Sequence, residues 1–182
     1  MTKPQIMFAA QKLSPGKGFG VFCRETHGLG ARCVAAGRKV DLAVPEHVEH
    51  LGILGRCGLL ATMRASTVVC CPSLWPESFG RIAVESMAVG TPVIATAYGG
   101  YVDQILEGET GWLIESNMPG ALRRAIMVAI ETVTPEMRAR CREWARQRFG
   151  EQVVTSAHDA LLAWQATRFL RERERRDTEQ CE

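Results

Sequence analysis

The sequence predicts an α/β fold of the doubly wound, Rossmann-like type, with helices covering both faces of a parallel sheet. Short apolar runs typical of buried strands alternate along the chain with helical segments. Continuous apolar strands of this kind are typical of a parallel sheet that is covered on both faces. The length of 182 residues suits one well-packed domain and makes a second unlikely by size alone.

The elements follow one another in the order that such a fold needs. Strands are expected at 5–10, 31–37, 48–54, 67–72, 91–96 and 111–115, and helices at 18–30, 55–66 and 81–90. The third of these helices ends at Gly90, because glycine is favoured just after a last turn, and a short helix opens at Tyr101.

From Pro119 onward the pattern is helical only. One helix is expected over 119–132, and Thr134 and Pro135 then provide a cap and a first-turn proline for the next. A last helix begins near residue 151. We therefore expect residues 1–165 to form the α/β domain with its helical extension, and residues 166–182 to form a charged helix end.

The composition is that of an ordinary globular protein, with 46% apolar and 23% charged residues and a net charge of +2. This charge gives no case for a nucleic-acid partner, and no apolar run approaches the ~20 residues of a transmembrane helix. The apolar patch near the N-terminus is too short for a signal peptide. Seven cysteines, an odd number without zinc-site spacing, predict free thiols and a cytoplasmic location.

The stretch from Trp75 to Gly100 carries the chemistry. Glu77 and Glu85 stand on either side of Gly80, where the helix over 81–90 is expected to begin. Ligands of doubly wound sheets collect beyond the carboxyl ends of the strands. A helix start there offers free N–H groups and a partial positive charge to a phosphate, and glycine permits close approach.

The acids must then address other groups, because a carboxylate repels a phosphate. Glu77 suits neutral hydroxyls or a developing positive charge, and Glu85, further along the helix, suits the two hydroxyls of a ribose. Lys12 and Lys17 follow the first strand, and a parallel sheet brings them to the same edge, where they would neutralise a diphosphate. This layout suits a nucleotide-sugar. Each residue has a plainer reading: Glu77 as an acid near a helix cap, Glu85 as a solvent-facing acid, and the lysines as surface charges.

Three motifs occur in a familiar order. The sequence from about residue 5 to 165 resembles the C-terminal, donor-binding half of family-4 glycosyltransferases of the GT-B fold, the group 1 glycosyl transferases. Glu77 to Glu85 matches the E-x7-E motif of that family. KLSPGKG at 12–18 resembles its GRLSPEKG run, and the segment 90–114 resembles its GTPVIA…GG…E…G.TG.L run.

The resemblance implies that Glu77 contacts donor-sugar hydroxyls and that Lys17 binds phosphate, so these two are the expected catalytic residues. It also implies that Glu85 binds the ribose, and that the strand end at Ile53 and Leu54 holds the base. The residues implied for donor binding are Lys12, Ile53, Leu54, Ser78, Phe79, Gly80, Arg81, Glu85, Gly99 and Gly100. Lys12 stands where the family usually has an arginine.

The resemblance implies transfer of a sugar from a nucleotide-sugar with retention of configuration, and without a metal or other cofactor. The sequence contains no Asp-x-Asp to hold a metal. Lys12, Lys17 and the helix start at Gly80 would stabilise the departing nucleoside diphosphate. Glu77 would stabilise the positive charge on the sugar.

The match has gaps. The acceptor-binding half of the family is absent from the sequence, only residues 38–50 join the second and third strands, and Gly16 replaces the usual acid before Lys17. We therefore expect an acceptor-binding partner chain or domain, or a homo-oligomer. A non-catalytic nucleotide-sugar-binding module, or a related enzyme that epimerises or hydrolyses the nucleotide-sugar, remains an alternative.

Two other patterns have more than one interpretation. Val154, Ala157, Leu161 and Trp164 form an apolar stripe on the last helix that either packs on its own domain or awaits a partner chain. The two histidines of EHVEH at 46–50 are expected to be surface residues. Shared binding of a metal is the alternative.

Overall fold

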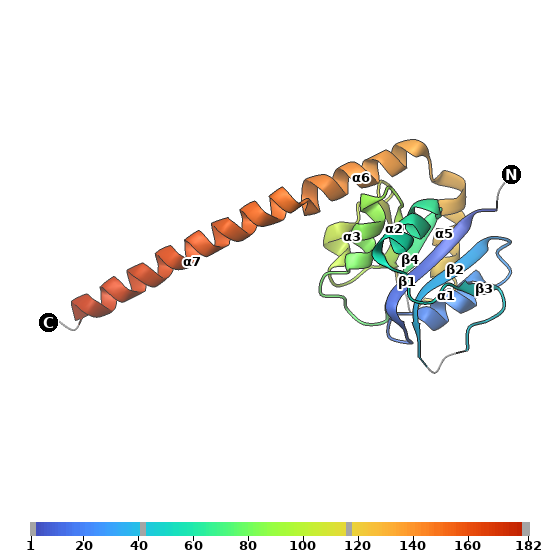
Figure 1. The fold of residues 1–182 in the computed structure, drawn as a ribbon, viewed down its shortest axis with the longest axis horizontal. Helices are drawn as coiled ribbons and strands as arrows, with labels where there is room; N and C mark the ends of the chain where they lie inside the picture. The colour runs from blue at the N-terminus through green and yellow to red at the C-terminus, as the bar shows by residue number, and fades with distance from the viewer. Residues whose placement is uncertain (1–2, 41–42, 116–117, 180–182) are drawn as a thin grey trace. The chain divides into compact units, whose positions relative to one another are not determined.

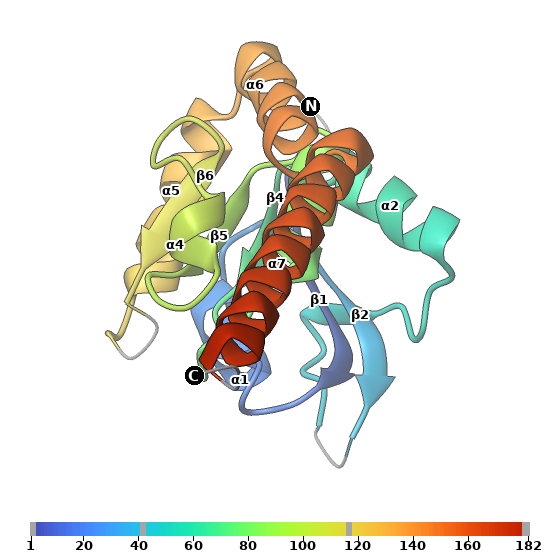
Figure 2. The same cartoon turned by 90° about the vertical axis from the view of Figure 1, so that its left-hand side faces the viewer.

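The computed structural model describes residues 3–40, 43–115 and 118–179, and its internal contacts divide the chain into units 1–145 and 146–182. In the described residues the first unit is built on a sheet of six strands, which Figures 1 and 2 draw as arrows. The strands are β1 (Gln5–Leu13), β2 (Arg32–Lys39), β3 (Val48–His50), β4 (Val68–Cys71), β5 (Val93–Thr96) and β6 (Gly111–Ile114). All pairs are parallel and the order is β3-β2-β1-β4-β5-β6. The doubly wound parallel sheet is therefore confirmed.

Helices follow β1, β3, β4, β5 and β6, as the sequence predicts. They are α1 (Phe19–Thr26), α2 (Arg56–Ala65), α3 (Arg81–Ala88), α4 (Tyr101–Gln104), α5 (Ala121–Thr132) and α6 (Pro135–Phe149), the last of which runs past the end of the first unit. The Thr134 hydroxyl accepts a hydrogen bond from the N–H of Met137 at 3.3 Å, and Pro135 is the first residue of α6. The predicted cap and first-turn proline are thus confirmed.

Glycines in the left-handed region end two elements earlier than expected. The strand expected to reach residue 54 stops at His50, because Gly52 has φ 69° and turns the chain out of the strand. The N–H of Leu51 still donates to Ala35 O at 2.9 Å, so the departing segment stays next to β2. In the same way α1 ends at Thr26, before Gly28 at φ 71°.

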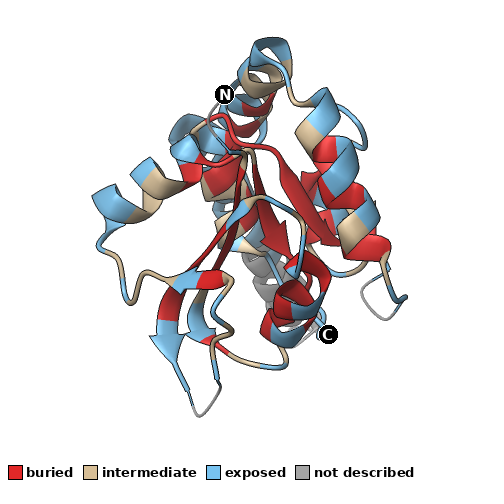
Figure 3. Cartoon of the chain, turned by 90° about the vertical axis from the view of Figure 1, so that its right-hand side faces the viewer, coloured by how far each residue is buried: buried red, intermediate tan, exposed pale blue. Residues whose placement is uncertain are grey.

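Both faces of the sheet are buried, as Figure 3 shows for the strands. Ile6 and Phe8 on one face join a core cluster with residues of α1 and α5. The ring of Phe8 lies 5.3 Å from that of Phe19. Met7 alternates to the other face and is fully buried, as are Met63 of α2 and Met87 of α3.

Helix α6 is tied to the rest of the first unit by side chains that reach backbone carbonyls. Arg138 donates to Ser66 O at 2.6 Å, and the indole N–H of Trp144 donates to Gln104 O at 2.7 Å. The latter bond links α6 to α4. Helix α4 in turn contacts the loop before α3, because the Gln104 amide donates to Phe79 O.

The second unit contains the end of α6 and the long helix α7 (Glu151–Glu179). The large members of its predicted apolar stripe are exposed: Val154 by 56%, Leu161 by 52% and Trp164 by 56%. The predicted boundary at residue 165 falls within α7 and stays a prediction. In the described part of the chain, no helix combines the length and apolarity needed to cross a bilayer.

The described cysteines are free thiols, and the two histidine rings of EHVEH are hydrogen-bonded. Six cysteines are free, as predicted, and Cys181 lies outside the described residues. His47 and His50 are half-buried rather than surface residues, because their ring nitrogens donate to Cys23 O at 3.0 Å and Gly37 O at 2.8 Å. Within the described ranges no three His, Cys, Asp or Glu side chains gather as metal ligands.

Candidate functional site

The candidate site lies at the carboxyl ends of β1 and β4. The strand order reverses at this pair of strands, and in doubly wound sheets that is where ligands bind. Two adjoining cavities of about 450 Å³ and about 380 Å³ lie here. They share residues from the end of β1 and from the first turns of α3, namely Ala9, Ala10, Gln11, Arg81, Ile82 and Glu85.

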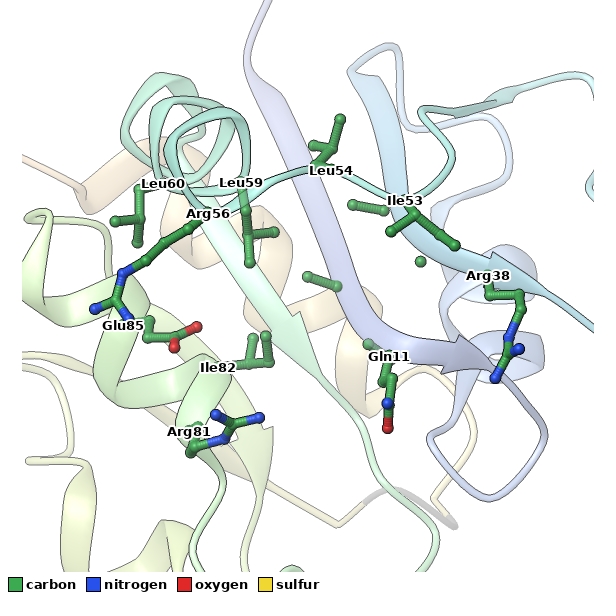
Figure 4. A pocket seen from close by; sticks show the side chains of 14 residues that line it. Gln11, Arg38, Ile53, Leu54, Arg56, Leu59, Leu60, Arg81, Ile82 and Glu85 are labelled. Atoms are coloured by element: carbon green, nitrogen blue, oxygen red, sulfur yellow. The ribbon is translucent and has the colours of Figure 1, made fainter.

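The first cavity has apolar walls with a charged rim (Figure 4). Ile53 and Leu54, in the segment that leaves the sheet after β3, form one side, and Leu59 and Leu60 of α2 form another. Arg38, Arg56, Arg81 and Glu85 provide the charges. A cavity with this lining suits a largely apolar ring with a polar group beside Glu85.

The second cavity is more polar than the first and contains the two residues expected to be catalytic. Lys17, from the turn after β1, forms an ion pair with Glu77, from the loop after β4. The Lys17 side chain is 46% exposed and that of Glu77 only 18%. The hydroxyl of Ser73 lies 3.5 Å from the same carboxylate oxygen. The acid is thus held within the cavity by partners from both loops.

The start of α3 requires glycine for two separate reasons. Gly80 has φ 81°, in the left-handed region that glycine tolerates best. A Cβ at this position would also lie 2.4 Å from Cε1 of Tyr101, closer than any real contact. The ring of Tyr101 therefore packs directly beneath the backbone at the helix start.

Residues 99–104 support the loop of Glu77 from behind. The N–H of Gly100 donates to Glu77 O at 2.7 Å, and the Gln104 amide donates to Phe79 O. A Cβ at Gly99 would lie 2.6 Å from Glu77 O. Because the carbonyls of residues 77 and 79 are engaged here, the loop is fixed as it enters α3.

Two buried side chains lie at the bottom of the second cavity. Tyr101 is 4% exposed and Cys71 is 5% exposed, and the phenol hydrogen-bonds the thiol. Burial raises the pKa of Cys71 to about 12, and burial also raises the pKa of Tyr101. Both groups are therefore uncharged at neutral pH and leave the charges of the cavity to Lys17, Glu77, Arg81 and Glu85.

Most of the residues singled out from the sequence meet in these cavities. Those that line the second are Lys17, Glu77, Ser78, Phe79, Gly80, Arg81 and Glu85, and those that line the first are Ile53, Leu54, Arg81 and Glu85. Gly99 and Gly100 support the loop of Glu77 instead. Lys12 is exposed, pairs in register with Arg38 and lies outside the lining of both cavities, so its role at the phosphates stays a prediction.

Sequence reasoning did not identify several lining residues. Arg38 and Arg56 carry no motif, and Gln11 stands where the related GRLSPEKG run has its first glycine. The position of all three follows from the way β1, β2 and α2 meet. Tyr101 stands next to the Gly-Gly pair in the sequence, but its contact with Gly80 joins two loops and is visible only in the folded chain.

The fold and site define an α/β domain with two adjoining cavities at the carboxyl ends of β1 and β4. Residues 37–148, more than half of the chain, match the family model described as glycosyl transferases group 1. The chain therefore belongs to this family.

The curated relatives are considerably longer than this chain. D-inositol 3-phosphate glycosyltransferase of Corynebacterium glutamicum (strain R) is 34% identical over 127 residues, which are 70% of this chain and 27% of the relative. Phosphatidyl-myo-inositol mannosyltransferase of Mycobacterium leprae (strain TN) is 36% identical over 85 residues, which are 47% of this chain and 23% of the relative. The matches thus span about a quarter of these proteins.

Solved structures show the same fold. Anabaena Alr3699/HepE in complex with UDP and glucose has a TM-score of 0.72 at 23% identity, over 86% of this chain and 49% of that one. Sucrose-phosphate synthase from Thermosynechococcus elongatus has a TM-score of 0.79 at 22% identity, over 91% of this chain and 46% of that one. In each case the chain corresponds to about half of the larger structure.

Proposed function

We propose that this chain is the donor-binding half of a retaining, metal-independent glycosyltransferase that takes its sugar from a nucleotide-sugar. The observation that carries the proposal is that Lys17, Glu77, Gly80 and Glu85 line one cavity, although the sequence spreads them over two loops and a helix. Membership of the glycosyl transferases group 1 family supports the reaction class.

The order of groups along the two cavities matches the order of groups in a nucleotide-sugar. The apolar walls of the first cavity accept the base, and Glu85, which lines both cavities, accepts the ribose hydroxyls. The start of α3 at Gly80 receives the diphosphate. Glu77 and Lys17 then face the sugar and its bond to phosphate.

The ion pair between Lys17 and Glu77 implies a specific order of events when the donor binds. Before the donor arrives, the acid holds the lysine at the cavity. When the diphosphate enters, Lys17 exchanges its partner for a phosphate oxygen, and the carboxylate becomes available to the sugar. Charge that develops on the leaving diphosphate is then met by Lys17 and by the helix start, both already in place.

Donor binding tests this proposal without any knowledge of the acceptor. The full chain is incubated with UDP-, GDP- and ADP-sugars, and binding is followed by thermal shift and calorimetry. Glu85→Ala should weaken donor binding by about 1–3 kcal/mol, since it removes a charged acceptor of hydroxyl hydrogen bonds. Glu109→Ala is the matched control, because Glu109 pairs with Arg140 outside both cavities.

Turnover separates an enzyme from a binding module. Glu77→Gln should leave donor affinity within about threefold and lower the release of nucleoside diphosphate much further, because its charge is needed in the transition state. The assay needs an acceptor-binding partner chain or domain, or a homo-oligomer. Unchanged donor affinity in Glu85→Ala contradicts the ribose assignment. Binding without any turnover in the complete assembly favours the non-catalytic module, and product from the donor alone favours an epimerase or hydrolase.

A further inference from the structure

The loop between β4 and α3 carries an indole that the donor site does not use. Trp75 is 70% exposed and lies outside the lining of both cavities. A single exposed apolar side chain is common on protein surfaces. Trp75 differs because its ring rests on the turn that carries Lys17.

The ring of Trp75 is seated on the turn that follows β1. A Cβ at Gly16 would lie 2.8 Å from Cδ1 and 2.9 Å from Nε1 of the indole, so the ring lies directly against this glycine. The same glycine accepts hydrogen bonds from Leu74 N–H at 2.9 Å and from the Ser73 hydroxyl at 3.2 Å. Pro76 follows and restricts the backbone. The indole, which belongs to the loop after β4, therefore rests on the turn after β1.

Gly16 is the position at which the sequence departs from the acid of the related motif. In this chain the absence of a side chain at residue 16 leaves the space that the indole fills. The glycine that departs from the motif and the exposed tryptophan are thus the two partners of one contact.

The indole borders the catalytic end of the site. Gly16 precedes Lys17, and Trp75 stands two residues before Glu77, while Lys17 and Glu77 are joined by their ion pair. The indole thus rests on the residue that precedes Lys17 and belongs to the loop that carries Glu77. Aromatic and charged groups together suit a sugar ring, whose C–H groups pack on an aromatic face while its hydroxyls hydrogen-bond to charged groups.

We propose that Trp75 is the stacking platform of an acceptor subsite, and that its ligand is a neutral pyranose ring. The inference rests on the proposed function, since it places the acceptor next to the end of the donor that Glu77 addresses. The apolar surface in this loop consists of Trp75 with Leu74 and Phe79, which are 44% and 47% exposed. Three side chains are well short of the ~800 Å² per partner of a standard protein interface, which favours a small ring over a protein.

Saturation-transfer NMR on the full chain with UDP present tests the subsite, with methyl α-mannopyranoside and methyl α-glucopyranoside as probes. Saturating the aromatic protons should transfer signal to the ring C–H protons of at least one probe at ~10 mM, the weak range expected for one ring. Trp75→Ala should weaken this binding about 3–10-fold, as for the loss of one aromatic contact. Trp75→Phe should retain most of it.

Trp164→Ala is the matched control, because Trp164 is also an exposed tryptophan but lies on α7. It should leave the sugar signal unchanged, and UDP binding should be equal in all the variants. A Trp75→Ala signal equal to that of the wild type, or no transfer to either probe, overturns the subsite. Self-association that Trp75→Ala abolishes also overturns it and assigns the surface to a second copy.

The two proposals fail in distinguishable ways. If the wild-type chain binds no nucleotide or nucleotide-sugar, the proposed function fails whatever the pyranosides do. If UDP binds and Glu85→Ala weakens it, while the pyranosides do not depend on Trp75, the donor site stands and the acceptor subsite alone is rejected.

Discussion

Three helices of this protein begin in the same way, and they differ in what surrounds their first residues. Helices α1, α3 and α5 each follow a glycine in the left-handed region: Gly18 at φ 76°, Gly80 at φ 81° and Gly120 at φ 75°. All three positions therefore have a positive φ, which favours glycine over any residue with a side chain. A Cβ would meet the carbonyl oxygen of Pro72 at 1.8 Å, the ring of Tyr101 at 2.4 Å, and the flexible end of Arg124 at 3.0 Å, respectively.

The comparison shows that tertiary contacts, and not the turn itself, decide how strictly glycine is needed. Gly18 follows Lys17, and Gly80 lines the second cavity. At both positions the loops approach so closely that no side chain fits. Gly120 has a similar φ without such a close approach. Its substitution therefore measures the loss of stability that the φ angle alone causes.

Gly18→Ala should have the largest effect of the three. The left-handed conformation costs an L-residue about 1–2 kcal/mol, and the methyl group would overlap a backbone oxygen that moves only with the end of β4. We expect the free energy of unfolding to fall by about 4 kcal/mol or more, measured by urea denaturation. If the variant does not accumulate in soluble form, that result agrees with the prediction. Wild-type stability would contradict it.

Gly80→Ala should have an intermediate effect on stability and a clear effect on binding. Strain of about 1–2 kcal/mol adds to overpacking against Tyr101 of about 1–3 kcal/mol. Donor affinity should fall as well, because the methyl group displaces either the ring or the helix start. Calorimetry with the donor and urea denaturation measure the two effects.

The overlap with Tyr101 can be isolated in a double-mutant cycle. In a Tyr101→Ala background the ring is gone, so adding Gly80→Ala should cost only the strain of the left-handed angle. The two substitutions should therefore be non-additive by about 1–3 kcal/mol. Additive effects would show that the ring does not limit residue 80.

Gly120→Ala should have the smallest effect, about 1–2 kcal/mol from the backbone angle alone. The nearby Arg124 can move its guanidinium aside. Donor affinity should be unchanged, because residue 120 lines neither cavity. A loss equal to that of Gly80→Ala would mean that the angle, and not the surroundings, sets the requirement.

The sequence predicts the elements of this fold well because apolar runs and glycines mark them directly. It fails where a glycine inside a run changes direction, as at Gly52, which ends β3 early. The extra residues of that run, Ile53 and Leu54, form a cavity wall instead. An apolar run alone does not distinguish a strand from the segment that leaves it.

The candidate site is predictable where motif spacing fixes a position relative to a helix start, as for Glu77, Gly80 and Glu85. The sequence explains glycine at position 80 by the close approach of a phosphate. The ring of Tyr101 gives a second reason, which motif spacing does not reveal. Lys12 shows the converse limit. Its place in the motif puts it at the edge of the sheet where the candidate site lies, but neither cavity includes its side chain.

The short edge strand β3 has a consequence for local opening of the sheet, which amide hydrogen exchange measures. β3 is three residues long and pairs with β2 alone, so its amides should exchange with solvent faster than those of β1 or β4. Ile53 and Leu54, which line the first cavity, follow shortly after β3 in the chain, so we expect an opening of this edge to widen that cavity. A bound nucleotide would slow amide exchange at residues 48–50. Part of its binding free energy would then stabilise the closed form of this edge of the sheet.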